Sequence, residues 1–417
     1  MKNTINPIII LIPFFVISQE IKFSDPDRQG VDNDRIERIT ELSKKYIDDK
    51  KVANVTTIIN RNGKIIYYNS FGNRGFDDKG EVKKDDLYRI YSMTKPVVSV
   101  AIMQLYEKGL FHLNDPIDKF LPEFKNQNIA LKKDSLVKAK NKITFKHLLT
   151  HTSGMSYGWS QHPADSYYRK ADIWMSKSLD EFTKKIASLP LRFEPGTKYN
   201  YSVSTDILGA LVEKISGLKL SEYLSKNIFK PLGMDDTFFE VPIEKYNRLL
   251  PNHRFNRMTK KIQTINDNNS YRIMDFDSGG AGLISTAMDY MLFAECLRNG
   301  GELNGKRIIG TKTIKYMVSN HLPTSVLGIG RGESPTDPAI SAITFGLGFG
   351  ILNNPSVSSV IGSKGSYSWG GAAGTIFWID PVENIVVVSM IQLMSSPWTL
   401  RNDLRVATYQ SLVDVYE

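Results

Sequence analysis

Two strand–turn–strand patterns at opposite ends of the 417-residue chain constrain its fold more than any other feature. The first places a β-rich run on each side of Asn62-Gly63, and Asn-Gly in this setting is the strongest short-range signal of a β-hairpin. The second closes the chain around Asp380-Pro381. The four predicted strands cover residues 52–60, 65–71, 375–379 and 384–392. We expect both hairpins to join one antiparallel sheet built from the two ends of the chain.

Helical patterns account for much of the remaining chain. Residues 32–50 and 399–416 have helical periodicity, and a long middle segment at about residues 113–273 is mostly helical. The sequence therefore predicts an α+β fold in which helices flank the sheet and a mostly helical insertion interrupts it. We expect one domain over residues 19–417, with its sheet part at about 32–112 and 274–417. A functional site is expected at the seam of the two parts.

The first residues have the pattern of an export signal. Met1-Lys2 gives a short positive start, residues 8–17 are largely apolar, and Ser18 is a small residue that suits cleavage before Gln19. The apolar run is far shorter than the roughly 20 residues that a membrane-spanning helix needs. We expect a signal peptide over residues 1–18, an exported (periplasmic or secreted) protein, and no stable membrane insertion after cleavage. A retained N-terminal anchor is the alternative.

Charge and cysteine content argue against a nucleic-acid-binding protein and against a fold stabilised by disulfides. The net charge is +9, but the basic pairs are scattered, whereas a nucleic-acid-binding protein gathers them on one face. The single cysteine, Cys296, cannot form an internal disulfide. We therefore expect no nucleic-acid partner, and we interpret Cys296 as a core residue.

A Ser-x-x-Lys tetrapeptide occurs three times, and only one copy has a favourable context. Ser135–Lys138 lies in a polar, lysine-rich stretch, and Gly217 interrupts Ser216–Lys219 by ending the preceding helix. Ser92–Lys95 instead opens a predicted buried helix, which has an apolar stripe from Val97 onward and a stop at Gly109.

Ser92 and Lys95 are the candidate nucleophile and its amine partner. Pro96 lacks an amide hydrogen and therefore fits the first turn of a helix, which places the helix start close to Ser92. The hydroxyl and the amine then lie about one turn apart on the same face. An amine in that position can help a serine to act as a nucleophile. A serine helix cap with a solvated lysine is the simpler alternative.

Two later segments offer partners for this pair. Tyr201 stands just before a helix that Ser204, Thr205 or Asp206 can cap, so its hydroxyl can face a cleft and move a proton. Packing under a loop is the structural alternative for this tyrosine. The segment Trp369-Gly370-Gly371-Ala372 leads into the final hairpin, and glycines weaken a strand unless something approaches its backbone closely. A substrate acyl group is one such reason and a β-bulge is another. The amides of Ser92 and Ala372 would together form an oxyanion hole.

Jointly, these segments resemble the serine β-lactamase and penicillin-binding protein superfamily, on its class C β-lactamase-like side. The likeness covers most of the chain and, besides the glycine-rich strand, includes residues 88–95, 147–155, 201–217, 231–234 and 279–283. In that superfamily the Ser-x-x-Lys serine is acylated, the lysine and a tyrosine move protons, and the strand completes the oxyanion hole. The resemblance implies a β-lactamase/transpeptidase-like fold. It also implies catalytic Ser92, Lys95 and Tyr201, and substrate binding by Trp369, Gly370, Gly371 and Ala372.

Two departures from the family pattern bear on the substrate. Val203 stands where β-lactamases usually have Asn, and Trp369 stands where they have Lys or His, a cation for a substrate carboxylate. Losing that cation removes a charge-assisted contact, and an indole favours a neutral, partly apolar substrate. These variants resemble the family VIII carboxylesterases. We therefore expect an exported serine hydrolase that acts on a small ester or amide, and on carboxylic esters above all, through an acyl-serine intermediate.

Other functions stay open. The same acyl-enzyme would serve a β-lactamase, a D-alanyl peptidase or an acyltransferase, and a catalytically silent binding protein is a further alternative. His147 and His151 have a spacing compatible with metal binding, but no His-Glu-x-x-His motif accompanies them. We interpret both as structural and expect no metal and no cofactor.

Overall fold

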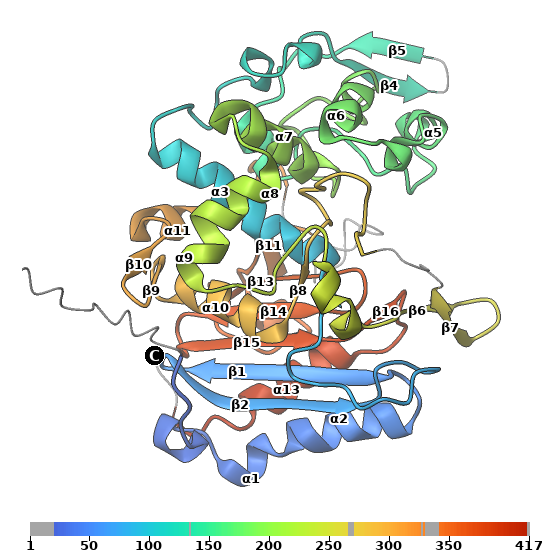
Figure 1. Ribbon diagram of the computed structural model, residues 1–417. Helices are drawn as coiled ribbons and strands as arrows, with labels where there is room; N and C mark the ends of the chain where they lie inside the picture. Colours follow the sequence, from blue (N-terminus) through green and yellow to red (C-terminus); the bar gives the residue numbers. More distant parts are fainter. Residues whose placement is uncertain (1–20, 133–134, 266–270, 327, 330–341, 415–417) are drawn as a thin grey trace, which may run out of the picture.

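The computed structural model describes residues 21–132, 135–265, 271–326, 328–329 and 342–414 (Figure 1). The predicted signal peptide, residues 1–18, lies outside these ranges. Within them, no helix combines the length and the apolar character needed to cross a membrane.

A seven-stranded antiparallel sheet has the order β11-β12-β13-β14-β15-β1-β2. Its strands are β1 (Asn54–Arg61), β2 (Lys64–Gly72), β11 (Ile343–Phe345), β12 (Gly350–Leu352), β13 (Tyr367–Gly370), β14 (Ile376–Asp380) and β15 (Ile385–Met390). β1 pairs with β15 from Thr56 opposite Met390 to Arg61 opposite Ile385. The prediction that both chain ends build one sheet is confirmed, and the two ends meet inside the sheet rather than at its edge.

The first hairpin turns where the sequence predicts. Asn62 and Gly63 have φ angles of 54° and 76°, so both central residues adopt the left-handed conformation that a tight two-residue hairpin turn requires. The side chain of Asn60 accepts a hydrogen bond from the Gly63 amide at 3.0 Å.

Helices cover both faces of the sheet (Figure 1). On one face, α10 (Ala287–Arg298) packs against β1, β14 and β15, and it buries Cys296 as expected of a core residue. On the other face lie α1 (Asn33–Ile36), α2 (Arg38–Asp48) and α13 (Leu400–Tyr409). Alternate strand residues serve the two sides: Phe377 belongs to the core that contains α10, and Trp378 to the core beneath α2 and α13.

The segment between the hairpins contains α4 (Phe145–Leu149), α5 (Pro163–Lys170), α6 (Leu179–Ala187), α7 (Ser204–Ser216), α8 (Leu220–Leu224) and α9 (Lys230–Leu232), with the short pairs β4–β5 (Asn128–Lys132, Ser135–Lys138) and β6–β7 (Asn252–Asn256, Lys261–Ile265). In Figure 1, α5, α6, α7 and β4–β5 form the upper part of the molecule, α8 and α9 lie below them, and β6–β7 lies at the level of the seven-stranded sheet. The remaining short elements are β3 (Tyr88–Arg89), β8 (Ile284–Ser285), β9 (Glu302–Leu303), β10 (Lys306–Arg307), α11 (Thr311–Met317) and β16 (Leu393–Met394). The division at residues 113 and 273 stays a prediction.

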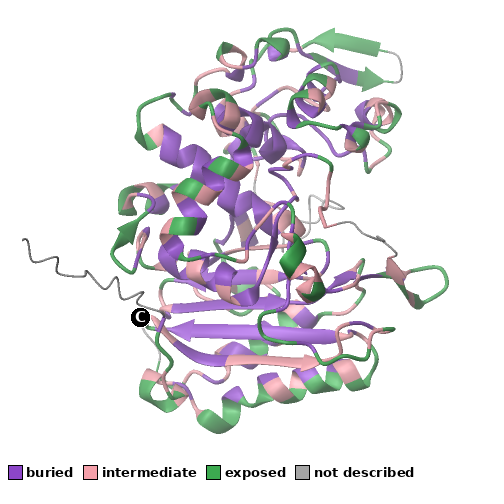
Figure 2. Ribbon diagram, in the orientation of Figure 1, coloured by how far each residue is buried: buried purple, intermediate pink, exposed green. Residues whose placement is uncertain are grey.

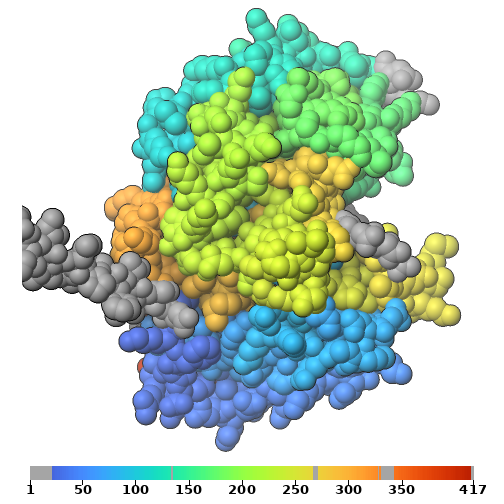
Figure 3. Space-filling view, viewed as in Figure 1, coloured from blue at the N-terminus to red at the C-terminus, as the bar shows by residue number. Residues whose placement is uncertain are grey.

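One helix links the sheet part to the upper helices. α3 (Thr94–Glu107) is buried from Thr94 through Leu105 and packs against α7. Figure 2 shows it as a nearly continuous purple helix in the middle of the molecule. On the face shown in Figure 3, yellow-green and yellow residues, from about 220 to 280, lie between the blue N-terminal strands and the upper helices. The start of α3 is therefore held by packing from several directions.

Candidate active site

Ser92 lies immediately before α3, in a short 3-10 turn formed by Tyr91–Met93. The α-helix begins at Thr94, two residues later than Ser92. Lys95 is 1 % exposed, and its Nζ donates to Ser92 Oγ at 3.3 Å. Tyr91 has a φ of 44°, a conformation that is unfavourable for a residue with a side chain, and such strain is typical of functional positions. The structure therefore brings together the serine and lysine that the sequence pairs.

A buried hydrogen-bond network that includes the Asp206 carboxylate holds Lys95 in place. Lys95 Nζ donates to the Gly280 carbonyl at 2.5 Å, and Asp206 Oδ1 accepts from the Gly280 amide at 3.0 Å and from Ser278 Oγ at 2.5 Å. Burial raises the pKa of Asp206, while the charge of Lys95 opposes that rise. A Cβ on Gly280 would stand 2.3 Å from Asp206 Oδ2, so this position requires glycine. Asp206 does not cap its helix as the sequence suggests, because the N-cap is Val203.

Tyr201 lies beside the same lysine. Lys95 Nζ is 4.7 Å from the centroid of the Tyr201 ring, and Trp369 Nε1 donates to the Tyr201 hydroxyl at 3.4 Å. Burial and a hydrogen bond to Tyr201 raise the pKa of Tyr157 well above its ordinary value, so Tyr157 stays protonated and can donate to the same oxygen. The phenolic oxygen of Tyr201 thus faces two donors, an environment suited to an oxygen that accepts and returns a proton.

His151 borders the site as a neutral imidazole. Its ring centroid is 4.8 Å from that of Tyr201, and burial together with the charge of Lys95 lowers the pKa of His151 well below its ordinary value. The Ser202 amide donates to His151 Nδ1 at 3.3 Å, so the proton of the neutral ring is on Nε2. His147 instead completes a capping box with Thr144 at the start of α4. Within the described ranges, no group of three or more His, Cys, Asp or Glu side chains has the arrangement of a metal site.

The glycine-rich strand reaches the site through Trp369. The Trp369 ring lies 5.4 Å from the Tyr201 ring and 5.2 Å from the Phe345 ring, measured between centroids. The close backbone approach that the glycines suggest comes from the protein itself, because a Cβ on Gly371 would stand 2.3 Å from the Ile90 carbonyl oxygen. The strand thus packs directly against the segment that leads into Ser92.

Aromatic side chains that the sequence analysis did not single out form one wall of the site. Tyr157 stacks on Trp159 with ring centroids 4.1 Å apart and an interplanar angle of 8°, and Trp174 lies 5.8 Å from Tyr157. Trp159 is 74 % exposed, so one side of this stack is open to solvent. Only the local density of Tyr and Trp between residues 157 and 174 signals this wall in the sequence.

Three other serines with suggestive motifs lie outside the site. Gly154–Gly158 matches Gly-x-Ser-x-Gly, but its Ser156 is buried and donates to Asp165 at 2.7 Å. Ser135 lies on β5, an exposed strand, and Ser216 ends α7 just before Gly217, whose φ is 73°. Neither tetrapeptide lies within one helix, as the sequence context predicts.

Replacing Tyr157 with Phe should slow by about tenfold the ester cleavage that the sequence leads us to expect, because a hydrogen bond to a charged group contributes about 1.5–3 kcal/mol. Trp369 remains as a second donor to Tyr201, which limits the loss. The measurement is kcat for a p-nitrophenyl ester. Tyr223→Phe is a matched control, since Tyr223 is buried on α8. A normal rate for Tyr157→Phe would show that its hydroxyl does not assist Tyr201.

Comparisons with known proteins agree with this architecture. The family model described as Beta-lactamase matches residues 39–410, nearly the whole described chain. Protein Rv1367c of Mycobacterium tuberculosis is 29 % identical over 364 residues, which cover 82 % of this chain and 86 % of that protein. Esterase EstB of Burkholderia gladioli is 28 % identical over 403 residues, which cover 89 % and 94 %.

A solved structure extends the likeness to three dimensions. EstCE1, described as a hydrolase with promiscuous acyltransferase activity, superimposes with a TM-score of 0.76 at 25 % identity, covering 91 % of this chain and 99 % of that one. The fold and these relatives define a serine hydrolase of the β-lactamase/transpeptidase-like type. The chain belongs to the Beta-lactamase family, whose members here include esterases.

Proposed function

We propose that the protein hydrolyses small carboxylic esters through an acyl-enzyme on Ser92. The observation that carries this proposal is Trp369, whose neutral indole donates to Tyr201 where a cation would hold a substrate carboxylate. An uncharged aromatic surface at that point favours an uncharged substrate. The Tyr157–Trp159 stack adds a second apolar wall. The name of the relative EstB and the description of EstCE1 support the same reaction class.

The proposed reaction moves one proton in each half. Ser92 Oγ attacks the ester carbonyl carbon while its proton passes to the Lys95–Tyr201 pair. Tyr201 then returns a proton to the leaving alkoxide oxygen as the carbon–oxygen bond breaks, which releases the alcohol. Water attacks the acyl carbonyl, gives up a proton to the same pair, and the carboxylic acid leaves as Ser92 Oγ is protonated again. Because the two groups share the proton, the step does not assign it to one of them alone.

The test compares an ester with a β-lactam under one set of conditions. Purified protein should turn over p-nitrophenyl butyrate far faster than nitrocefin, and mass spectrometry of the quenched reaction should find the butyryl group on Ser92. Efficient nitrocefin hydrolysis with no ester cleavage would refute the substrate assignment. No covalent adduct with any member of an ester and β-lactam panel would refute the acyl-enzyme itself.

Acyl transfer is a second candidate function. It is supported by the description of EstCE1, which combines hydrolysis with acyltransferase activity, and by apolar walls that can hold an alcohol in place of water. Adding an alcohol to the ester assay and separating the products distinguishes the two functions. A new ester as main product would show transfer, and free acid alone would show hydrolysis.

We also propose that the protein is exported after cleavage before Gln19. The support is the charge and apolar pattern of residues 1–18. Intact-mass measurement of protein from the culture medium or the cell envelope would show a chain that begins at Gln19. A chain that retains Met1 there would favour an uncleaved anchor.

A further inference from the structure

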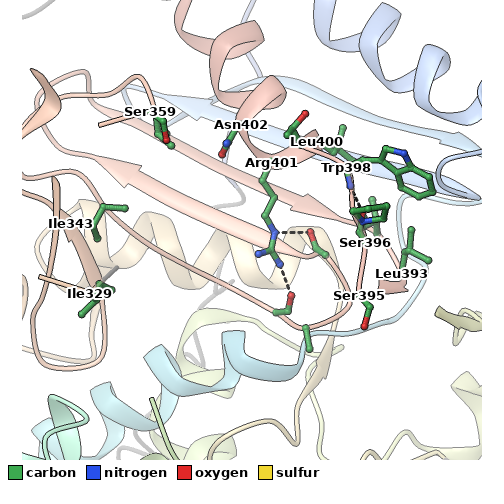
Figure 4. A pocket seen from close by; sticks show the side chains of 17 residues that line it. Ile329, Ile343, Ser359, Leu393, Ser395, Ser396, Trp398, Leu400, Arg401 and Asn402 are labelled. Atoms are coloured by element: carbon green, nitrogen blue, oxygen red, sulfur yellow. Dashed lines mark hydrogen bonds between the residues drawn. The ribbon is translucent and has the colours of Figure 1, made fainter. Parts of the chain in front are cut away.

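The turn between β13 and β14, residues 371–375, receives a guanidinium from outside the sheet. Arg401, the second residue of α13, donates from Nη2 to the carbonyls of Gly371 and Thr375, the latter at 2.9 Å, and from Nε to the Gly374 carbonyl at 3.2 Å (Figure 4). A Cβ on Gly370 would stand 3.0 Å from the guanidinium carbon, so the glycine leaves room for this contact. One side chain therefore bonds to both ends of the turn.

The bonds of Arg401 reinforce those within the turn. The Gly371 amide donates to the Thr375 carbonyl at 2.8 Å, and the Gly374 amide donates to the Gly371 carbonyl at 3.1 Å. Arg401 binds the same two carbonyls, and charge-assisted hydrogen bonds from a planar guanidinium are stronger and more directional than neutral ones. The guanidinium thus fixes the orientation of the peptide groups in the turn.

The turn lies against the segment that carries the nucleophile. Thr375 Oγ1 donates to the Ile90 carbonyl at 3.5 Å, two residues before Ser92. In the proposed reaction the Ala372 amide, in the middle of this turn, stabilises the oxyanion together with the Ser92 amide. Such donors act only when they stand about 2.7–3.1 Å from the position that the oxyanion will occupy. A small rotation of the turn would therefore reduce the stabilisation of the transition state more than it would reduce the affinity for the substrate.

The helix that carries Arg401 is itself firmly anchored. Leu400 and Leu404 are buried in the core beneath the sheet, and Asp403 accepts a hydrogen bond from Tyr46 of α2 at 2.5 Å. The base of the Arg401 side chain is consequently fixed to the far face of the sheet, while its tip reaches the turn at the site.

We propose that Arg401 is a positioning residue that holds the Ala372 amide in the geometry needed to stabilise the oxyanion. This inference rests on the proposed function, since an oxyanion forms only in acyl transfer. It assigns a task in catalysis to a residue on α13, which acts on the site through the turn that it binds.

The test uses Arg401→Gln and Arg401→Ala, with Asn402→Ala as the matched control on the exposed neighbouring position. We expect kcat for p-nitrophenyl butyrate to fall about tenfold or more in both Arg401 variants, with KM nearly unchanged. The inhibition constant of butylboronic acid, whose tetrahedral adduct places an oxygen in the oxyanion hole, should rise by about the same factor. Asn402→Ala should change neither quantity.

Chemical rescue separates positioning from a general loss of structure. Arg401 lines an open cleft of about 650 Å³, together with Trp398, Leu400 and Asn402 (Figure 4), so a small guanidinium can reach the vacated position. Methylguanidinium should restore part of the kcat of Arg401→Ala and leave Arg401→Gln unchanged. If Arg401→Gln fails to fold, the rescue of Arg401→Ala decides the question.

Two outcomes would overturn the inference. One is a kcat and a boronate inhibition constant that stay within twofold of wild type in both Arg401 variants. The other is a rise in KM alone. By contrast, a wild-type enzyme that cleaves no ester would refute the proposed function, and the inference would fall with it.

Discussion

Ser92→Ala should abolish ester cleavage, with a loss of at least about 10⁴ in kcat, because the acyl-enzyme path needs a nucleophile that alanine cannot supply. Labelling by a fluorophosphonate probe should disappear in the same variant. The structure gives the reason for so large an effect: the Ser92 hydroxyl lies 3.3 Å from the amine of Lys95, which is buried.

The control for this variant is Ser135→Ala. Ser135 belongs to a tetrapeptide of the same form but lies on an exposed strand, so the substitution should leave both the rate and the labelling unchanged. Persistent labelling of Ser92→Ala would mean that another residue is acylated. Persistent turnover without labelling would indicate a mechanism with no covalent serine intermediate.

Tyr201→Phe should lower kcat at least about a hundredfold, the range of general acid–base contributions. The substitution keeps the ring beside Lys95 and removes only the oxygen that Trp369 and Tyr157 face. Because leaving-group protonation is lost, the effect should be larger for an ethyl ester than for a p-nitrophenyl ester, whose leaving group needs little help. Measuring kcat for both esters checks this.

Tyr199→Phe provides the comparison, since Tyr199 lies two residues earlier and contacts Phe345 and His151 through its ring. Its hydroxyl has no part in the proposed proton transfer, so the rate should stay close to wild type. Equal losses in the two variants would point to disturbed packing of this segment. A near-normal rate for Tyr201→Phe would remove Tyr201 from the mechanism.

The parts of the fold that the sequence predicts are those set by local chemistry. Asn62-Gly63 determines the first hairpin because two consecutive residues must adopt left-handed φ angles. Gly217 likewise ends α7 and separates Ser216 from Lys219. The pairing of β1 with β15 has no local signal in the sequence, and its register is fixed by the packing of both faces of the sheet.

Several components of the site have no local signature. Asp206 has the appearance of a helix cap in the sequence. Only the folded structure shows that it accepts hydrogen bonds from the 278–280 segment, whose Gly280 carbonyl binds Lys95. Arg401 follows the glycine-rich strand by about thirty residues, and nothing in its own segment indicates the turn that it binds. Tyr157 and Trp159 come together with Tyr201 through tertiary packing. Such contacts depend on the folded chain and not on spacing.

The antiparallel pairing of β1 with β15 has a consequence for how the protein is made. A ribosome synthesises β15 long after β1, so β1 can hydrogen-bond to β2 early but has no second neighbour until β15 has been made. Strands paired over so long a loop form slowly. We therefore expect the sheet of the nascent polypeptide to remain incomplete and open to chaperones until β15 has been synthesised, and truncations that remove β15 should yield protein that is degraded in the cell.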